Sequence, residues 1–194
     1  MDIQKPLILA SGSPRRRELL SQAGFDFTVC PAKGEEHTSF TLPYDVVCEL
    51  SRQKALEIAK LQAAPCYIIG ADTIVSFQEQ ILGKPKDNDD AVNMITLLQG
   101  NTHQVYTGVT LIEVTDDGKL RDFSFYEETN VHVCPMTKEE ILSYVATGEP
   151  LDKAGAYGIQ GAFSIYVSGI EGDYFNVVGL PVSRLYHEFK NFAH

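Results

Sequence analysis

The sequence predicts a fold of the α/β or α+β class, because patterns typical of strands and of helices alternate along the chain. Its 194 residues suit one large domain or two closely joined small ones. Apolar residues make up 44% of the chain and charged residues 22%, the composition of a soluble globular protein. No apolar run approaches the ~20 residues of a membrane helix, and the N-terminal apolar stretch of about five residues is too short for a signal peptide. We therefore expect a cytoplasmic protein with no membrane partner.

The N-terminal half predicts strands that alternate with helices. A buried strand over 6–10 leads into a helix over 14–23, with Ser13 as N-cap, Pro14 at the first helical position and Gly24 after the last turn. The further predicted elements are a strand over 27–30, a helix over 44–63, and a strand over 67–77 that returns as a hairpin strand over 80–82.

The C-terminal half continues the alternation. The helical period recurs over 89–98, and two long strand patterns over 102–114 and 120–134 are joined by a turn. Thr137 and Glu140 form a capping box that opens a short helix over 137–146. The remaining predicted elements are a Gly-rich loop over 147–161, a strand over 163–170 and a last helix over 181–192.

The charge balance limits the partners of this chain. Sixteen Lys and Arg residues stand against 26 Asp and Glu residues, so the net charge is −10. Such a chain repels nucleic-acid backbones at long range, so we expect no nucleic-acid partner. A phosphate site must therefore be a local cluster of cations.

The first such cluster follows the first predicted strand. Ser11 and Ser13 lie in a tight turn, and Arg15, Arg16 and Arg17 occupy the first turn of the next helix. Cations at that end oppose the helix dipole, and a bound phosphate would offset the penalty through backbone N–H groups, hydroxyls and guanidinium groups. A solvated basic helix end is the alternative. No Walker A motif occurs in the chain.

The second cluster follows the strand that begins at residue 67. Asp72 emerges from a buried strand, where its carboxylate can bind a metal or activate water, and Thr73 follows it. A cap or a turn is the alternative for both residues. Lys84 stands shortly after, between Gly83 and Pro85, as a point charge for phosphate or as a turn residue.

The third cluster is the segment 152–161, in which small residues alternate with polar ones. The amide of Gln160 offers both a donor and an acceptor, which suits the edge of a nucleobase, whereas a flexible surface loop is the alternative. Glu35, Glu36 and Lys54 are further candidates for metal and phosphate binding. Their pattern alone is more typical of surface charges.

Cysteines and histidines give no catalytic pattern. The four cysteines form no CxxC pair, which argues against a structural zinc site, and we expect buried thiols without disulfides. The five histidines show no ligand spacing, and His103 and His132 lie in strand patterns that suggest structural roles. Covalent nucleophilic catalysis has little support.

Seven motifs run along the chain in this order: LASGSPRR (9–16), SRQKA (51–55), GADT (70–73), GKP (83–85), QGNTHQVYTGV (99–109), DKAGAYGIQG (152–161) and NVVGLP (176–181). Taken together, these motifs resemble the Maf family of nucleoside triphosphate pyrophosphatases. The resemblance spans nearly the whole chain in order and spacing, and DKAGAYGIQG is similar to the subgroup that acts on dTTP and UTP rather than on 7-methyl-GTP.

The resemblance implies an enzyme that cleaves a nucleotide between its α- and β-phosphates. It implies one domain over 1–194, either undivided or with two lobes around a cleft. Its fold would be Maf/ITPase-like, with an elongated central sheet flanked by helices and a central nucleotide-binding cleft. A homodimer and a divalent cation, Mg²⁺ or Mn²⁺, are implied as well.

The resemblance also assigns roles to single residues. It places the general base at Asp72, substrate choice at Arg15, Thr73 and Gln160, and the motif lysines at Lys54 and Lys84. The acidic position before the second helix falls on Glu35 or Glu36. We expect Glu36 and Asp72 to hold the cation, and Ser11, Ser13 and Arg16 to bind substrate.

Two other functions fit parts of the pattern. A nucleotide-binding regulator could use the same pocket, but a carboxylate at position 72 would repel a ligand that is only bound, which favours an enzyme. A triphosphatase for damaged purine nucleotides differs only in its substrate profile. The sequence leaves the physiological substrate and the preferred metal open.

Overall fold

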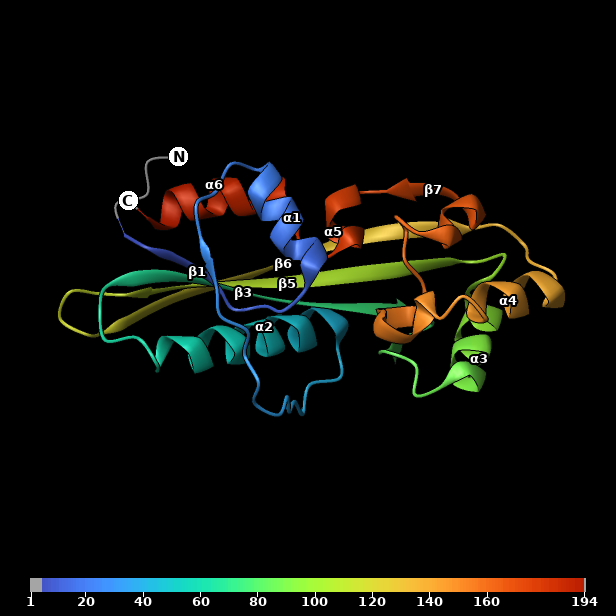
Figure 1. Ribbon diagram of the computed structural model, residues 1–194, viewed down its shortest axis with the longest axis horizontal. Helices are drawn as coiled ribbons and strands as arrows, with labels where there is room; N and C mark the ends of the chain where they lie inside the picture. The colour runs from blue at the N-terminus through green and yellow to red at the C-terminus, as the bar shows by residue number, and fades with distance from the viewer. Residues whose placement is uncertain (1–4, 194) are drawn as a thin grey trace. The chain divides into compact units, whose positions relative to one another are not determined.

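The computed structural model describes residues 5–193, and its strands form one mixed seven-stranded sheet (Figure 1). The strand order is β2-β1-β3-β5-β6-β7, and β4 pairs with β3. The strands are β1 (Leu7–Leu9), β2 (Thr28–Val29), β3 (Cys66–Phe77), β4 (Gln80–Leu82), β5 (Thr102–Val114), β6 (Leu120–Val133) and β7 (Val167–Glu171). The helices are α1 (Pro14–Gln22), α2 (Pro43–Ala59), α3 (Asn88–Leu98), α4 (Lys138–Val145), α5 (Tyr174–Val178) and α6 (Val182–Phe192), with 3₁₀ turns η1 (Glu149–Asp152), η2 (Ala154–Ala156) and η3 (Ala162–Tyr166).

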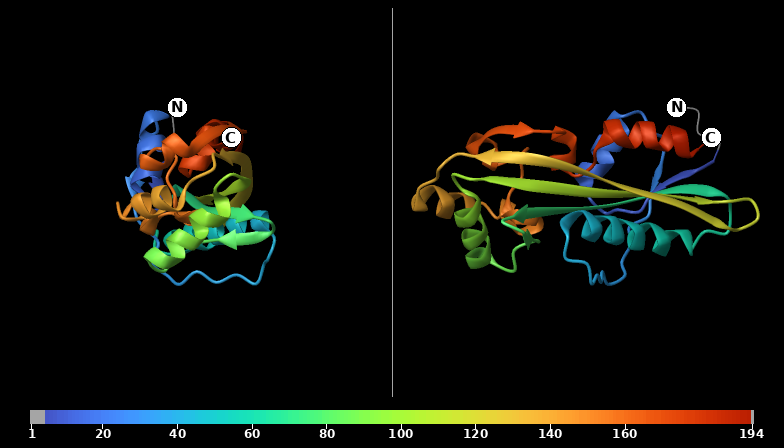
Figure 2. Two further views of the ribbon diagram at one scale, coloured as in Figure 1. Left: turned by 90° about the vertical axis from the view of Figure 1, so that its right-hand side faces the viewer. Right: turned by 180° about the vertical axis from the view of Figure 1, so that it is seen from behind.

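Parallel and antiparallel pairs share this sheet, which confirms the mixed class. β1 pairs in parallel with both β2 and β3, whereas β3 and β4 form the predicted antiparallel hairpin. β6 and β7 are antiparallel, with a register shift between His132 and Val133. Figure 2 shows β5 and β6 as adjacent long strands joined by a turn.

The described chain divides into two compact units. The first unit comprises the chain up to Asp72, Thr107–Glu127 and the chain from Gly179 onward, and the second comprises Thr73–Tyr106 and Glu128–Val178. Strands β3, β5 and β6 contribute residues to both units. The cleft expected from the resemblance stays a prediction.

In the first unit, helices cover both faces of the strands. Figure 1 shows α2 on one face and α1 with α6 on the other. Phe189 of α6 packs its ring against Phe25 and Tyr67, with centroids 5.8 and 5.2 Å apart. The core on the α2 side consists of Ile8, Ala10, Ala55, Ile58, Ala59, Cys66, Ile68, Ile112 and Val114.

Two glycines let the backbone of α2 lie in direct contact with the backbone of these strands. A Cβ atom at Gly70 of β3 would lie 2.2 Å from the carbonyl oxygen of Ser51, and one at Gly108 of β5 would lie 2.3 Å from that of Val47. Real atoms do not approach so closely, so a side chain at either position would push the helix away. The two glycines therefore fix how α2 lies on β3 and β5.

The second unit has an apolar core of its own. Phe163 is fully buried, and its ring packs against those of Tyr144, Tyr157 and Tyr166 at 5.0, 4.8 and 5.6 Å. Helix α3 contacts α4, η1 and η2. Buried members of this core include Val75, Leu82, Ile95, Leu98, Val105, Val131, Ile141, Tyr157 and Phe163.

The predicted elements differ from the structure mainly in the last third of the chain. The predicted strand over 163–170 is wrong at its start, because Ala162–Tyr166 form η3 and the strand covers Val167–Glu171. The segment contains apolar residues because Phe163 packs into the core, and not because it forms a strand. The predicted loop over 147–161 contains η1 and η2, and α5 was not predicted, because five residues show no helical period.

Candidate active site

The turn before α1 is held by its own two serines. Ser13 Oγ accepts a hydrogen bond from the backbone N–H of Arg16 at 3.5 Å, which confirms the predicted N-cap. Ser11 Oγ accepts from the N–H of Ser13 at 3.3 Å and from Nη1 of Arg16 at 3.2 Å. The predicted basic cluster thus begins in a folded turn, in which both serine side chains and the Arg16 side chain form hydrogen bonds.

Arg16 connects three segments of the first unit. Its Nε donates to the carbonyl oxygen of Gly179 and its Nη1 to that of Ala71, both at 2.8 Å. Burial lowers the pKa of Arg16, and the charge of Asp72 raises that pKa again. An arginine remains protonated under these conditions, so Arg16 is a fixed positive charge beside Asp72. Its predicted contact with substrate stays a prediction.

Asp72, Lys54 and Glu36 form an ion-pair cluster near Gly70, where α2 lies closely against β3. Lys54 Nζ lies 2.5 Å from Asp72 Oδ1 and 3.1 Å from Glu36 Oε1. Asp72 is buried, with 8% of its surface exposed. The close approach of α2 at Gly70 explains this meeting, because Lys54 and Asp72 follow the two backbone segments in contact.

The loop that carries Glu36 is fastened to the same helix. Both oxygens of Glu57 accept backbone N–H groups, from Lys33 at 2.8 Å and Gly34 at 3.0 Å, and these bonds lower the pKa of Glu57. Gln53 accepts from the N–H of His37 at 3.3 Å and donates to its carbonyl oxygen at 2.6 Å.

The two acidic candidates differ in their contacts. Glu36 reaches Lys54, whereas the side chain of Glu35 is 89% exposed and pairs only with His37, at 3.1 Å, among the contacts of residues 5–193. Sequence reasoning missed Glu57. Its signal was the helical spacing, because Glu57 stands three residues after Lys54 and so shares its face of α2.

The second unit brings two other motifs together. The carbonyl oxygen of Gly83 accepts the N–H of Gly155 at 3.0 Å. Gly155 has a φ of +66°, and a Cβ atom there would lie 2.7 Å from Val75 of β3, so only glycine fits. Lys84 and Gln160 are exposed in this region, and Thr73 of β3 is half-buried.

A buried pair holds the Gly-rich segment to β5. Nε2 of His103 lies 2.7 Å from the hydroxyl of Tyr157, and His103 is fully buried. Burial lowers the pKa of His103 to about 4 and raises the pKa of Tyr157, so both side chains are neutral near pH 7. The structural role expected for His103 is confirmed.

The acidic residues of the cluster suit a cation that also binds phosphate. Within residues 5–193, no group of three or more His, Cys, Asp or Glu side chains could hold a metal ion alone. Mg²⁺, however, binds through one or two carboxylates together with substrate phosphates, and Glu36 and Asp72 supply that number.

All four cysteines are free thiols, as expected. Only Cys66 is buried, so the expectation of buried thiols was wrong for the other three.

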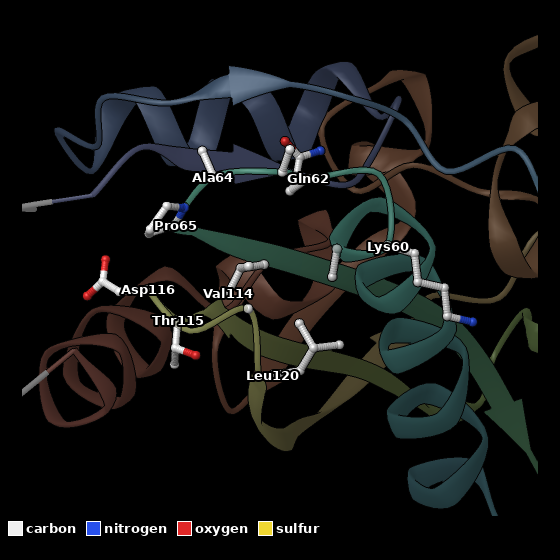
Figure 3. A pocket seen from close by; sticks show the side chains of 11 residues that line it. Lys60, Gln62, Ala64, Pro65, Val114, Thr115, Asp116 and Leu120 are labelled. Atoms are coloured by element: carbon white, nitrogen blue, oxygen red, sulfur yellow. The ribbon is translucent and has the colours of Figure 1, made fainter.

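A hollow of about 290 Å³ lies elsewhere in the first unit, between the end of α2 and the β5–β6 turn. Figure 3 shows Asp116 and Lys60 on opposite sides of it. None of the predicted site residues lines this hollow.

In the described part of the chain, no helix is both long and apolar enough to cross a membrane.

Comparison with known proteins agrees with the motifs. The sequence matches the family described as Maf-like protein over residues 6–192. A dTTP/UTP pyrophosphatase of Lachnoclostridium phytofermentans is 54% identical over 187 residues, which cover 96% of this chain and 95% of the relative. Another, from Bacillus cereus, is 48% identical over 189 residues, which cover 97% and 96% of the two chains.

Among solved structures, a HAM1 protein from Coxiella burnetii has a similar fold. The TM-score is 0.54 at 12% sequence identity, and the match covers 97% of this chain and 100% of the other. At this identity the similarity concerns the fold alone. It confirms the expected architecture of a sheet flanked by helices.

Proposed function

Because this chain belongs to the Maf family, we propose that it hydrolyses dTTP and UTP to the nucleoside monophosphate and pyrophosphate. The observation that carries the proposal is the buried carboxylate of Asp72, held 2.5 Å from Lys54 beside the fixed charge of Arg16. In the reaction, a water oxygen bonds to the α-phosphorus while the bond from that phosphorus to the bridging oxygen breaks. Pyrophosphate leaves with the electron pair of that bond.

We assign the activation of water to Asp72. A general base must lie within hydrogen-bond reach of the proton it takes, and Asp72 presents a carboxylate beside two cationic side chains, Lys54 and Arg16. Asp72 can also hold the cation, and the two roles compete for the same oxygens. Hydrolysis of this kind depends on positioning and on charge stabilisation more than on covalent chemistry.

The charges of the cluster argue for a divalent cation. Arg16 and Lys54 carry two positive charges, and Glu36 and Asp72 carry two negative ones, so the four side chains cancel. A neutral cluster alone does not attract a triphosphate. Mg²⁺ or Mn²⁺ on Glu36 and Asp72 would supply positive charge and stabilise the phosphate oxygens.

Other residues are proposed to bind the substrate. In the first unit, Arg15, Ser11 and Ser13 stand at the start of α1 and would contact phosphate oxygens, as would Lys54. In the second unit, we propose Lys84 for phosphate, and Thr73 with Gln160 for substrate choice. Arg15 already acts on its neighbour, because its charge lowers the pKa of Arg16.

A panel of nucleotides tests the proposal. UTP, dTTP, CTP, dITP and XTP are incubated with the protein and Mg²⁺ or Mn²⁺ in ¹⁸O-labelled water. We expect monophosphate and pyrophosphate from UTP and dTTP, with the label in the monophosphate. Label in pyrophosphate would contradict attack at the α-phosphorus.

Other results of the panel identify the rival functions. A preference for dITP or XTP would indicate an enzyme for damaged purine nucleotides. Tight binding without turnover of any nucleotide would indicate a regulator. The predicted homodimer stays a prediction, which light scattering during size-exclusion chromatography tests.

A further inference from the structure

The Gln160 segment of the second unit is a tight turn. The N–H of Gly161 donates to the carbonyl oxygen of Gly158 at 3.1 Å, so residues 158–161 form one turn with Gln160 at its third position. Gln160 itself is exposed. Its direction therefore depends on what holds the two ends of the turn.

Glu149 holds the end of this turn. One carboxylate oxygen accepts the backbone N–H of Ala162, the residue after the turn, at 2.9 Å. The other accepts the hydroxyl of Tyr144 at 3.1 Å. Glu149 thus joins α4 to the turn through one side chain.

The two glycines of the turn lie close to the side chains of Glu149 and Lys153. A Cβ atom at Gly161 would lie 2.1 Å from Glu149 Oε1, and one at Gly158 would lie 2.6 Å from Cε of Lys153. The ammonium of Lys153 in turn donates to the backbone oxygen of Glu149 at 2.7 Å. A side chain at position 158 or 161 would therefore displace Lys153 or Glu149.

We propose that Glu149 is a positioning residue for Gln160, and that it acts on the choice of nucleobase without touching the substrate. The proposal rests on the proposed function for its readout in activity. A charge-assisted bond to a backbone N–H is among the strong hydrogen bonds of proteins, and here it fixes the residue two positions after Gln160. A role in stability alone would leave base selectivity unchanged.

The first experiment compares Glu149→Ala, Glu149→Gln and the control Glu139→Gln. Glu139 is exposed on the first turn of α4, and so offers a matched substitution in the same unit. Urea unfolding selects folded variants, and kcat/KM is then measured for UTP and CTP, with inhibition by pyrophosphate as a probe of phosphate binding.

For Glu149→Ala we expect kcat/KM for UTP to fall about 5- to 50-fold, with a smaller fall for CTP, as for loss of a bond to a charged group. Inhibition by pyrophosphate stays the same. Glu149→Gln keeps an acceptor for Ala162 and recovers most of the activity. Equal losses for UTP and CTP would overturn the proposal.

A double variant tests whether Glu149 acts through Gln160. If it does, Glu149→Ala adds no further loss of UTP over CTP selectivity in a Gln160→Ala background. Additive losses of selectivity would mean that Glu149 acts by another route. Should Glu149→Ala fail to fold, Tyr144→Phe removes one partner of the carboxylate, and a smaller loss of selectivity is expected from it.

Amide hydrogen exchange tests the anchor without any activity. We expect faster exchange at Gly161 and Ala162 in Glu149→Ala than in the natural protein, and no change in Glu139→Gln. Unchanged exchange would overturn the positioning role even in an active enzyme. A different result would contradict the proposed function alone: the natural protein does not hydrolyse UTP, and Glu149→Ala still shows faster exchange at Gly161 and Ala162.

Discussion

The two units hold their functional side chains in different ways. In the first, Asp72 and Lys54 bond directly to each other, and they follow backbones pressed together at Gly70. In the second, Gln160 is exposed on a turn, and the residue after that turn, Ala162, bonds to the side chain of Glu149. The proposed chemical step thus lies at a place fixed by backbone packing, and the proposed base recognition at one held by a side-chain bond.

This difference has a physical reason. A carboxylate that activates water must stay in place, since small displacements of reacting groups cost rate steeply. A group that reads the edge of a base can rotate its amide and still make two hydrogen bonds. Variants in the first unit should therefore act on turnover or on folding, and variants in the second on selectivity.

The largest effect is expected for Asp72→Asn. The substitution keeps the volume and removes the charge, so kcat should fall about 10²–10⁴-fold, as for loss of a general base. Nucleotide binding, measured by calorimetry, should remain. Asp122→Asn is the control, because Asp122 pairs with Arg52 at 2.8 Å in the same unit, outside the proposed site. An Asp72→Asn variant with half the natural kcat would disprove the assignment.

The next effect is on folding, for Gly70→Ala. The new Cβ atom would meet the carbonyl oxygen of Ser51, so α2 must shift. Overpacking of this kind typically lowers the free energy of unfolding by about 1–3 kcal/mol, and we expect the upper end of that range, because the clash is with backbone. Gly83→Ala has nothing within 4 Å and serves as control. Equal urea midpoints for both variants would contradict the tight packing.

A smaller effect, confined to selectivity, is expected for Gln160→Ala. Part of the base edge loses its partner, which corresponds to about a 5- to 150-fold fall in kcat/KM for UTP and dTTP. The ratio of UTP to CTP should fall without vanishing, because backbone groups of the segment and Thr73 can share the discrimination. An unchanged ratio would place base recognition elsewhere.

The last effect concerns the dependence of stability on pH, and it is absent at neutral pH. His103 has a pKa of about 4 in the folded protein, below its ordinary value, so the unfolded chain binds a proton more readily. Stability from this group is complete above about pH 6.5 and is lost as the pH falls toward 4, by up to about tenfold in the folding equilibrium per pH unit. His103→Gln should flatten the pH dependence of the urea midpoint between pH 6.5 and 5. A slope equal to that of the natural protein would contradict the shift.

Much of the fold could be predicted from the sequence, because local signals and tertiary packing agree there. Ser13, Thr137 and Glu140 cap their helices as predicted, and the hairpin of β3 and β4 has its predicted bounds within one residue. The prediction was wrong at η3, where the apolar pattern reflects the burial of Phe163 and not a strand. Aromatic packing across a core has no sequence period.

For the candidate site, the sequence motifs point to single residues, and the structure adds the contacts between them. Motifs pointed to Lys54 and Asp72 separately, but their bond depends on the approach of α2 to Gly70. The ion pair of Glu36 with Lys54 likewise belongs to a loop that Glu57 holds against α2, and the sequence does not show that contact. The sequence did not point to Glu149, because its bond to the turn is to the backbone N–H of Ala162, a donor that any residue but proline provides.

The glycine contacts of α2 also bear on how Lys54 could change its partner. No side chain separates α2 from the strands at Gly70 and Gly108, so the backbone of the helix has little room to slide along them. In the proposed reaction the Lys54 ammonium would pass from Asp72 to a phosphate oxygen. The flexible stem of the lysine can supply that movement by rotation about its own bonds, with the helix left in place.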